Sequence, residues 1–236
     1  MVKFWVFFAL LVAVIGSLGN CDGGLDGSPF NVTINTHSGK GQKGSGDEKS
    51  ETRPVGTFDK IHAEGIGKLE VEVKEGLVPA LEVSTDDNLL PLVKTEVHSG
   101  TLEIGAGESI NPRSGLTVKI KTPSLAAVHL EGANKMELAI DSSKPLELHL
   151  EGAAKVTASG KVPKFTVHSE GASKVEATEL VAQEVDVQIA GAGHAKVNAT
   201  DTLRGQIEGA GVIAYKGQPR NVEREIAGIG KISRID

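Results

Sequence analysis

The chain has 236 residues, with 25 Lys and Arg against 31 Asp and Glu, a formal net charge of −6 and only 3% aromatic residues. The negative charge argues against a nucleic-acid partner, because phosphate backbones are bound by clustered Lys and Arg. Stacking on nucleic-acid bases depends on aromatic rings, and so does stacking on sugars. The low aromatic content therefore disfavours both kinds of binding site. The length suits one large domain with a leader and a linker, or at most two small domains.

The first 20 residues have the pattern of an export signal. Lys3 supplies a positive start, and residues 4–18 form an apolar run. That run is about as long as a signal-peptide core and shorter than a comfortable membrane span. We therefore expect residues 1–20 to be a signal peptide and the chain to be exported.

The single cysteine, Cys21, directly follows this segment. The sequence Ser17-Leu-Gly-Asn-Cys21 resembles a bacterial lipoprotein signal, in which the cysteine is acylated and becomes the mature N-terminus. Leu18 and Gly19 fit that pattern, whereas Asn20 replaces the small residue usual before the cysteine. We expect Cys21 to carry a lipid anchor, with ordinary signal cleavage and an uncleaved membrane anchor as the alternatives.

Residues 21–53 are rich in Gly, Ser and charged residues and contain few apolar ones. Such a composition cannot bury enough surface to offset the loss of chain entropy on folding. The sequence therefore predicts a flexible tether over residues 21–53, followed by a folded domain over residues 54–236.

The first part of the folded domain is irregular but rich in strand patterns. Residues 69–73 and 116–120 alternate apolar and polar side chains, as half-buried strands do. Residues 93–97 and 101–104 flank His98-Ser-Gly100, which predicts a hairpin. We expect this β-rich portion to pair with and cap the regular part that follows.

Residues 125–232 repeat one short phrase. It appears as His-Leu-Glu-Gly-Ala-Asn-Lys135, His-Leu-Glu-Gly-Ala-Ala-Lys155 and His-Ser-Glu-Gly-Ala-Ser-Lys174, with an early copy ending at Lys68. A period of about 19–20 residues with short apolar alternation is typical of stacked repeats. The predicted fold is therefore all-β, a single-stranded right-handed β-solenoid that resembles a β-helix. The glycines that mark the copies are Gly65, Gly132, Gly152, Gly171, Gly191, Gly209 and Gly228.

The alternation divides each copy between two faces, because successive side chains of a strand point to opposite sides. In the first regular copy Leu130, Gly132 and Met136 share the inner parity, whereas His129 and Glu131 share the outer one. Small residues always stand in the middle of the inner set. They predict a tight corner or a thin core, and glycine there permits unusual backbone angles.

The outer set aligns histidines in one column and glutamates in another. Imidazole and carboxylate groups are natural ligands of divalent metals. The alternative is a solvated ladder whose acids are offset by a column of lysines, with each surface ion pair contributing about 0–1 kcal/mol. Since a repeat does not by itself make ligands converge, the sequence favours the solvated ladder and predicts neither metal nor cofactor. The central members of this outer-face ladder are His129, His149, His168, Glu131, Glu151 and Glu170.

The sequence contains none of the common catalytic motifs. A Gly-x-Ser-x-Gly elbow, a phosphate-binding glycine loop and a His-Glu-x-x-His helix are all missing. Glutamates on neighbouring turns would lie about 5 Å apart, as in retaining glycosidases, but the repeat itself imposes that spacing. We therefore expect no catalytic residues and a protein that is not an enzyme.

Several phrases resemble one bacterial family. They are Gly-Ala-Ser-Lys-Val175, Ala-Gly-Ala-Gly-His-Ala-Lys-Val197, the closing Tyr-Lys-Gly-Gln-Pro219 and the opening Phe58-Asp-Lys-Ile. They are similar to the "putative auto-transporter adhesin head GIN domain", over about residues 54–235. The resemblance implies an exported or lipid-anchored β-solenoid of Gram-negative bacteria without an established biochemical role. Glutamates such as Glu131 stand where the family often has Ser, which makes this outer face more acidic.

Together these features predict a cell-envelope protein, in the periplasm or at the outer membrane or cell surface, held to a membrane through its N-terminus. The leading hypothesis is a non-enzymatic binding or adhesion scaffold for an envelope or surface ligand. The alternatives are a metal-binding or polysaccharide-acting protein that uses the His/Glu face, and a purely structural spacer. The sequence defines neither the ligand nor the oligomeric state.

Overall fold

The computed structural model describes residues 41–236, and within this range the protein is all-β, as expected. Cys21, the signal segment and residues 21–40 of the expected tether lie outside the described residues. Between residues 41 and 236, no helix is both long and apolar enough to cross a bilayer. The described elements are β1 (Gln42–Lys43), β2 (Glu48–Arg53), β3 (Lys60–Lys74), β4 (Ala80–Asp86), the 3-10 helix η1 (Leu90–Leu92), β5 (Val93–His98), β6 (Thr101–Ala106), β7 (Ile110–Asn111), β8 (Thr117–Thr122), β9 (Ala127–Asp141), β10 (Leu146–Lys216) and β11 (Asn221–Arg234).

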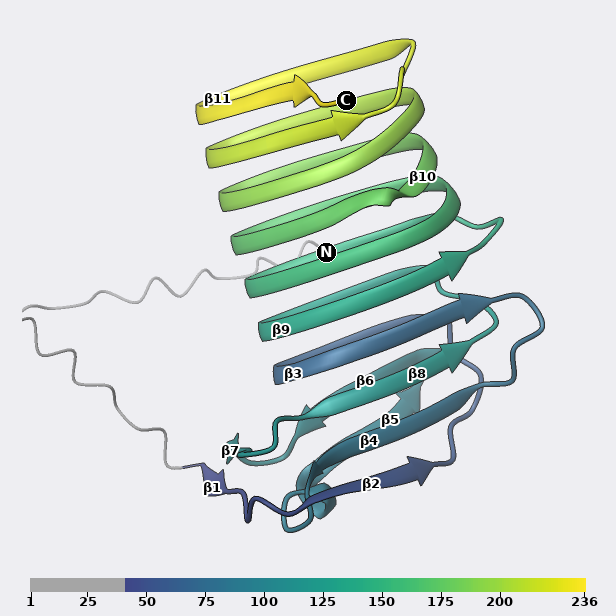
Figure 1. The fold of residues 1–236 in the computed structure, drawn as a ribbon, viewed down its shortest axis with the longest axis vertical. Helices are drawn as coiled ribbons and strands as arrows, with labels where there is room; N and C mark the ends of the chain where they lie inside the picture. Colours follow the sequence, from purple (N-terminus) through teal and green to yellow (C-terminus); the bar gives the residue numbers. More distant parts are fainter. Residues whose placement is uncertain (1–40) are drawn as a thin grey trace, which may run out of the picture. The chain divides into compact units, whose positions relative to one another are not determined.

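One curled sheet contains most of these strands, in the order β11-β10-β9-β3-β8-β4-β2 (Figure 1). The strands β5 and β6 pair antiparallel, which confirms the predicted hairpin, and β6 also pairs with β3. The short strands β1 and β7 form a separate pair. The irregular portion thus joins the regular one through β3, which pairs with both β8 and β9.

The folded region begins earlier than the sequence predicts. Residues 48–53, expected to belong to the tether, form β2, which pairs antiparallel with β4 from Glu48↔Asp86 to Arg53↔Leu81. The Arg53 guanidinium also donates a hydrogen bond of 2.8 Å to the carbonyl of Leu90. Most β2 side chains are exposed. Backbone pairing rather than apolar burial therefore holds this strand, which is why composition alone misjudged it.

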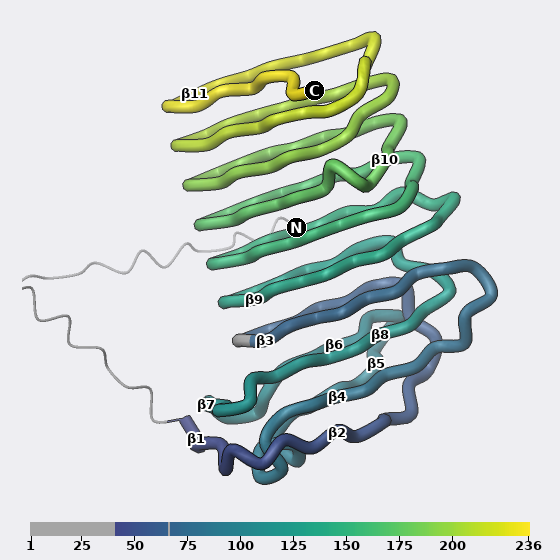
Figure 2. The backbone as a smooth tube through the Cα atoms, viewed as in Figure 1, coloured from purple at the N-terminus to yellow at the C-terminus, as the bar shows by residue number. Residues whose placement is uncertain are grey.

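The repeats pair with one another in parallel and in register. Gly65 lies opposite Gly132, Gly132 opposite Gly152, and Gly209 opposite Gly228. Figures 1 and 2 show β3, β9, β10 and β11 as successive turns that lie side by side. The repeated phrase of the sequence is therefore also the register of the hydrogen-bonded strands.

The inner parity of each turn forms the core. Leu130, Met136, Leu150 and Val167 are at most 1% exposed, and Phe165 fills the same interior. Complete burial of such a side chain contributes about 1.5–3 kcal/mol relative to leaving it in water. The alternation of apolar and polar residues in the sequence thus corresponds to the alternation of core and surface positions in the structure.

The repeat glycines do not lie in the core, contrary to the expectation from parity. Gly132, Gly152 and Gly171 are exposed and have φ values of 93°, 93° and 106°. Because the chain bends at these glycines, the regular alternation between inward and outward side chains is interrupted there. A glycine that alternation would place inside therefore lies at the surface. A Cβ added at Gly171 would lie only 2.6 Å from the carbonyl oxygen of Gly152 on the neighbouring turn. Positive φ and close stacking of turns both require glycine here.

A buried carboxylate ties the N-terminal strands to the rest of the sheet. Asp86 is fully buried and accepts hydrogen bonds from the backbone N–H groups of Gly46 at 2.7 Å, Arg113 at 2.8 Å and Ser114 at 3.3 Å. Burial raises the pKa of Asp86, but these hydrogen bonds outweigh it and the net pKa is lowered below the ordinary value of 3.8. The ionised form therefore stabilises the fold.

Replacing Gly171 by Ala tests the glycine corner. We expect Gly171→Ala to lower the free energy of unfolding by about 1–3 kcal/mol, because the new Cβ meets backbone atoms and φ is positive. Denaturant unfolding measures this. The matched control is Gly56→Ala, where an added Cβ meets nothing within 4 Å. Equal stabilities of the two variants would contradict the conclusion that position 171 requires glycine.

Replacing Asp86 by Asn tests the buried carboxylate through pH. A folded-state pKa below the unfolded one gives stability that is present above pH 3.8 and is lost as pH falls through the folded pKa. We expect Asp86→Asn to melt at a lower temperature than wild type at neutral pH, and the difference to shrink in acid. Thermal unfolding from pH 7 to pH 2 measures it. The exposed Asp141→Asn variant should follow wild type throughout, and a pH-independent difference for Asp86→Asn would contradict the prediction.

Candidate functional site

Four histidines stand in one column on the outer face. Strand pairing places His62 of β3 opposite His129 of β9, and His129 opposite His149 of β10. The imidazole centroids of His62 and His129 are 5.0 Å apart, those of His129 and His149 are 5.8 Å apart, and those of His149 and His168 are 4.9 Å apart. All four side chains are partly exposed. We call this column, with the carboxylates that contact it, the His–Glu ladder.

His62 has a carboxylate on each side of its ring. Its Nδ1 is 2.7 Å from Glu103 Oε2, and its Nε2 is 3.1 Å from Glu131 Oε1. Partial burial lowers the pKa of His62, but the hydrogen bonds with Glu131 and Glu103 outweigh it, so the net pKa is raised. The two carboxylates therefore stabilise the protonated, positively charged form of His62.

Glu131 also reaches the next histidine. Its Oε1 is 3.5 Å from His129 Nε2, so one carboxylate oxygen lies close to the imidazoles of two neighbouring turns. His129 Nε2 is also 3.1 Å from Glu151 Oε1. These groups form the first cluster of the ladder.

A second cluster forms further along the column. Glu147 Oε1 is 2.9 Å from His149 Nε2 and 3.5 Å from His168 Nε2. The other ring nitrogen of His168, Nδ1, is 3.2 Å from Gln188 Oε1. As in the first cluster, one carboxylate oxygen lies close to the imidazoles of two neighbouring turns.

The sequence identified some of these groups and missed others. Glu131 and Glu151 contact the histidines, whereas Glu170 is exposed and makes no side-chain hydrogen bond or ion pair within residues 41–236. Glu147 was missed, although it stands two residues before His149 and so shares its face. Glu103 comes from β6, and only the pairing of His62 with Glu103 brings it to the ladder.

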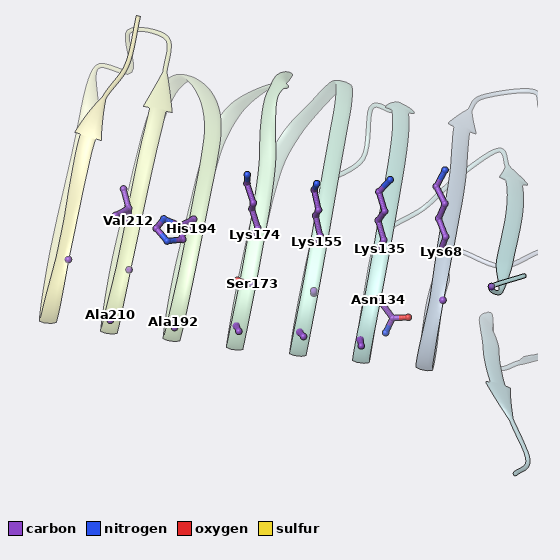
Figure 3. A pocket seen from close by; sticks show the side chains of 18 of the residues that line it. Lys68, Asn134, Lys135, Lys155, Ser173, Lys174, Ala192, His194, Ala210 and Val212 are labelled. Carbon is purple, nitrogen blue, oxygen red and sulfur yellow. The ribbon is translucent and has the colours of Figure 1, made fainter. Parts of the chain in front are cut away.

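A second surface feature is an open groove of about 1210 Å³ that runs across the turns just after the glycine corner. Figure 3 shows Lys68, Lys135, Lys155 and Lys174 on successive parallel strands, with His194 continuing the row. A parallel row of exposed small side chains lies two residues earlier on each turn. The groove's lining includes Ala133, Ala153, Ala172, Ala192 and Ala210, together with Ile229 at its end.

Small residues create this groove. Between the two rows lie the buried residues Asn134, Ala154, Ser173 and Gly211, which add no side chain to the surface and leave it hollow. The backbone N–H and C=O groups of the turns are engaged in the parallel ladder along the stack. The groove consequently presents Cα and Cβ atoms rather than free backbone groups.

The lysine row is only partly neutralised. Lys68 Nζ lies 2.6 Å from Glu70 and 3.1 Å from Glu137, and the hydrogen bonds with these glutamates raise the pKa of Lys68. Within residues 41–236, Lys155 and Lys231 make no ion pair. Two cationic groups of the groove thus remain available to an anion.

Solved structures share this fold. A putative adhesin from Bacteroides fragilis aligns with a TM-score of 0.66 and 23% identity, over 83% of this chain and 100% of that one. A putative adhesin from Parabacteroides distasonis aligns with a TM-score of 0.53 and 22% identity, over 82% and 99% of the two chains. A putative lipid binding protein from the same species aligns with a TM-score of 0.50 and 20% identity, over 84% and 100%.

No curated protein matches the chain. The family described as "Putative auto-transporter adhesin, head GIN domain" matches residues 57–219, which is more than half of the chain and includes the strands from β3 to β10. This match confirms the resemblance noted from the repeated phrases, and the chain belongs to that family.

Proposed function

We propose that this protein is an exported, lipid-anchored, non-enzymatic binding scaffold of the cell envelope. In this proposal its stacked turns form a single-stranded right-handed β-solenoid, supported by the in-register parallel pairing of β3, β9, β10 and β11. Membership of an adhesin family supports a binding role at the cell surface. The observation that carries the proposal is the open groove lined by alanines and lysines.

The chemistry of the groove favours an acyl chain over a peptide or a glycan. A peptide laid against alanine methyl groups would lose water from its backbone groups without new hydrogen bonds, which costs free energy. Glycan binding by stacking needs exposed aromatic rings, but in the described part of the chain Phe58, Phe165 and Tyr215 are at most 5% exposed. A hydrocarbon chain has no polar groups to satisfy.

The dimensions agree with this ligand class. The groove crosses seven turns, which at ~4.8 Å per turn extend about 29 Å. The hydrocarbon of one bilayer leaflet is about 15 Å thick, so a whole acyl chain fits along the groove. At ~4.8 Å per turn, Lys155 and Lys231 lie about 19 Å apart along the groove, so a carboxylate or phosphate head group would pair with one of these two ammonium groups. We therefore propose the acyl chain of an anionic lipid as the occupant.

The proposed anchor is Cys21, supported by the apolar run before it and by Leu18 and Gly19. A lipid-anchored scaffold would present its groove near membrane lipids, which are the proposed ligands.

Binding of a fluorescent fatty acid, displaced by palmitate, tests the groove. The measurement uses the full chain carrying Cys21→Ser, so that no attached lipid competes. We expect Ala172→Glu to weaken palmitate binding at least about tenfold, because it places an unpaired carboxylate where the acyl chain lies. The uncharged hexadecanol should displace the probe less well than palmitate.

The matched control is Ala190→Glu. Ala190 is exposed on the other side of the glycine corner, in the column that already holds Glu131, Glu151 and Glu170. This variant should bind palmitate like the parent chain. Absence of palmitate binding by the parent, or equal losses in both variants, would refute the lipid proposal.

Labelling cells with a radioactive fatty acid tests the anchor. We expect label on the wild-type chain and none on Cys21→Ser, because the thiol of Cys21 is the only one in the sequence. The labelled wild-type chain should sediment with membranes. An unlabelled wild-type chain would refute lipidation while leaving the groove proposal standing.

A further inference from the structure

We propose that the His–Glu ladder binds two divalent transition-metal ions of the zinc and copper class. His62, His129 and Glu131 hold the first, and Glu147, His149 and His168 hold the second. This inference is independent of the groove, which lies on the other side of the glycine corner.

In the first site, the two separations between the carboxylate oxygen and the imidazole nitrogens are close to those around a bound metal ion. Glu131 Oε1 lies 3.1 Å from His62 Nε2 and 3.5 Å from His129 Nε2, and the three donor atoms are within 4.8 Å of one another. Ligand atoms at 2.0–2.2 Å from a tetrahedral ion are roughly 3.3–3.6 Å apart. An ion can therefore be accommodated by small side-chain rotations.

The second site repeats the arrangement with a different carboxylate. Glu147 Oε1 lies 2.9 Å from His149 Nε2 and 3.5 Å from His168 Nε2. Glu131 comes two residues after its histidine, whereas Glu147 comes two residues before its own. The sequence disfavoured a metal because a repeat does not by itself make ligands converge. At these two sites the positions of Glu131 and Glu147 bring the ligands together, so that objection does not apply to them.

Each site also has a partner that orients one imidazole. Glu103 Oε2 lies 2.7 Å from Nδ1 of His62, and Gln188 Oε1 lies 3.2 Å from Nδ1 of His168. An acceptor at Nδ1 places the proton of a neutral ring there and leaves the Nε2 lone pair for a metal. In neutral His62 that lone pair otherwise faces the Glu131 carboxylate, a second acceptor. A metal ion between them satisfies both groups.

The donor set selects the class of ion. Two imidazoles and one carboxylate suit Zn²⁺ and Cu²⁺, whereas Ca²⁺ and Mg²⁺ prefer all-oxygen sites. The side chains of His62, His129 and Glu131 are 25%, 36% and 40% exposed, so an ion can enter and a water molecule can complete its coordination. Glu64 and Glu151 lie beside the first site and add negative charge.

Equilibrium dialysis of the untagged full chain in detergent against ZnCl₂, with the metal counted by elemental mass spectrometry, tests this proposal. We expect two Zn²⁺ ions per wild-type chain, one in Glu131→Gln, one in Glu147→Gln and none in the double variant. Circular dichroism checks that each variant keeps its β structure, as expected for isosteric changes of partly exposed side chains.

The matched control is Glu170→Gln, which removes a carboxylate from the same outer face at a position without a histidine contact. It should retain two ions. Glu103→Gln should weaken the first ion about 10–100-fold and leave the second unchanged, because only an orienting partner is lost. Fewer than two ions on wild type, a loss of ions in Glu170→Gln, or two ions retained by Glu131→Gln would overturn the proposal.

Discussion

Parallel, in-register backbone pairing is the constraint on which the rest of this structure depends. Each turn of β3, β9, β10 and β11 lies against the equivalent residues of its neighbours, with glycine opposite glycine at the corner. The carbonyl oxygen of one corner glycine occupies the space that a Cβ of the next would need. A single turn could not bury its apolar side alone, so the stack stabilises each member through its neighbours.

The same register creates both surfaces that carry chemistry. Because equivalent positions are stacked, one histidine per phrase becomes a column of imidazoles, and one lysine per phrase becomes a row of ammonium groups. The corner glycines separate the two: the His–Glu ladder precedes them on each turn and the groove follows them. The same turns therefore carry a polar surface of histidines and glutamates and an apolar groove with lysines along one side.

Departures from the repeat matter as much as the repeat itself. Glu103 reaches His62 from β6, which belongs to the irregular portion, and the free ammonium of Lys155 differs from the paired Lys68 and Lys135. The portion that we expected merely to cap the stack thus contributes a residue to the His–Glu ladder. Its strand β2 also extends the sheet with exposed, polar side chains that are held by backbone pairing and by Arg53.

The sequence by itself determined the all-β class, the period, the family and the columns of His, Glu and Lys, because strand alternation and repeat spacing are local properties of the chain. Only the tertiary structure decided that the corner glycines are exposed, that β2 belongs to the sheet, and which carboxylate contacts which histidine. Those outcomes depend on backbone bending and on pairing between distant strands. Glu147 and Glu170 each stand two residues from a histidine in the sequence. The geometry of neighbouring turns brings only Glu147, of these two, into contact with histidines.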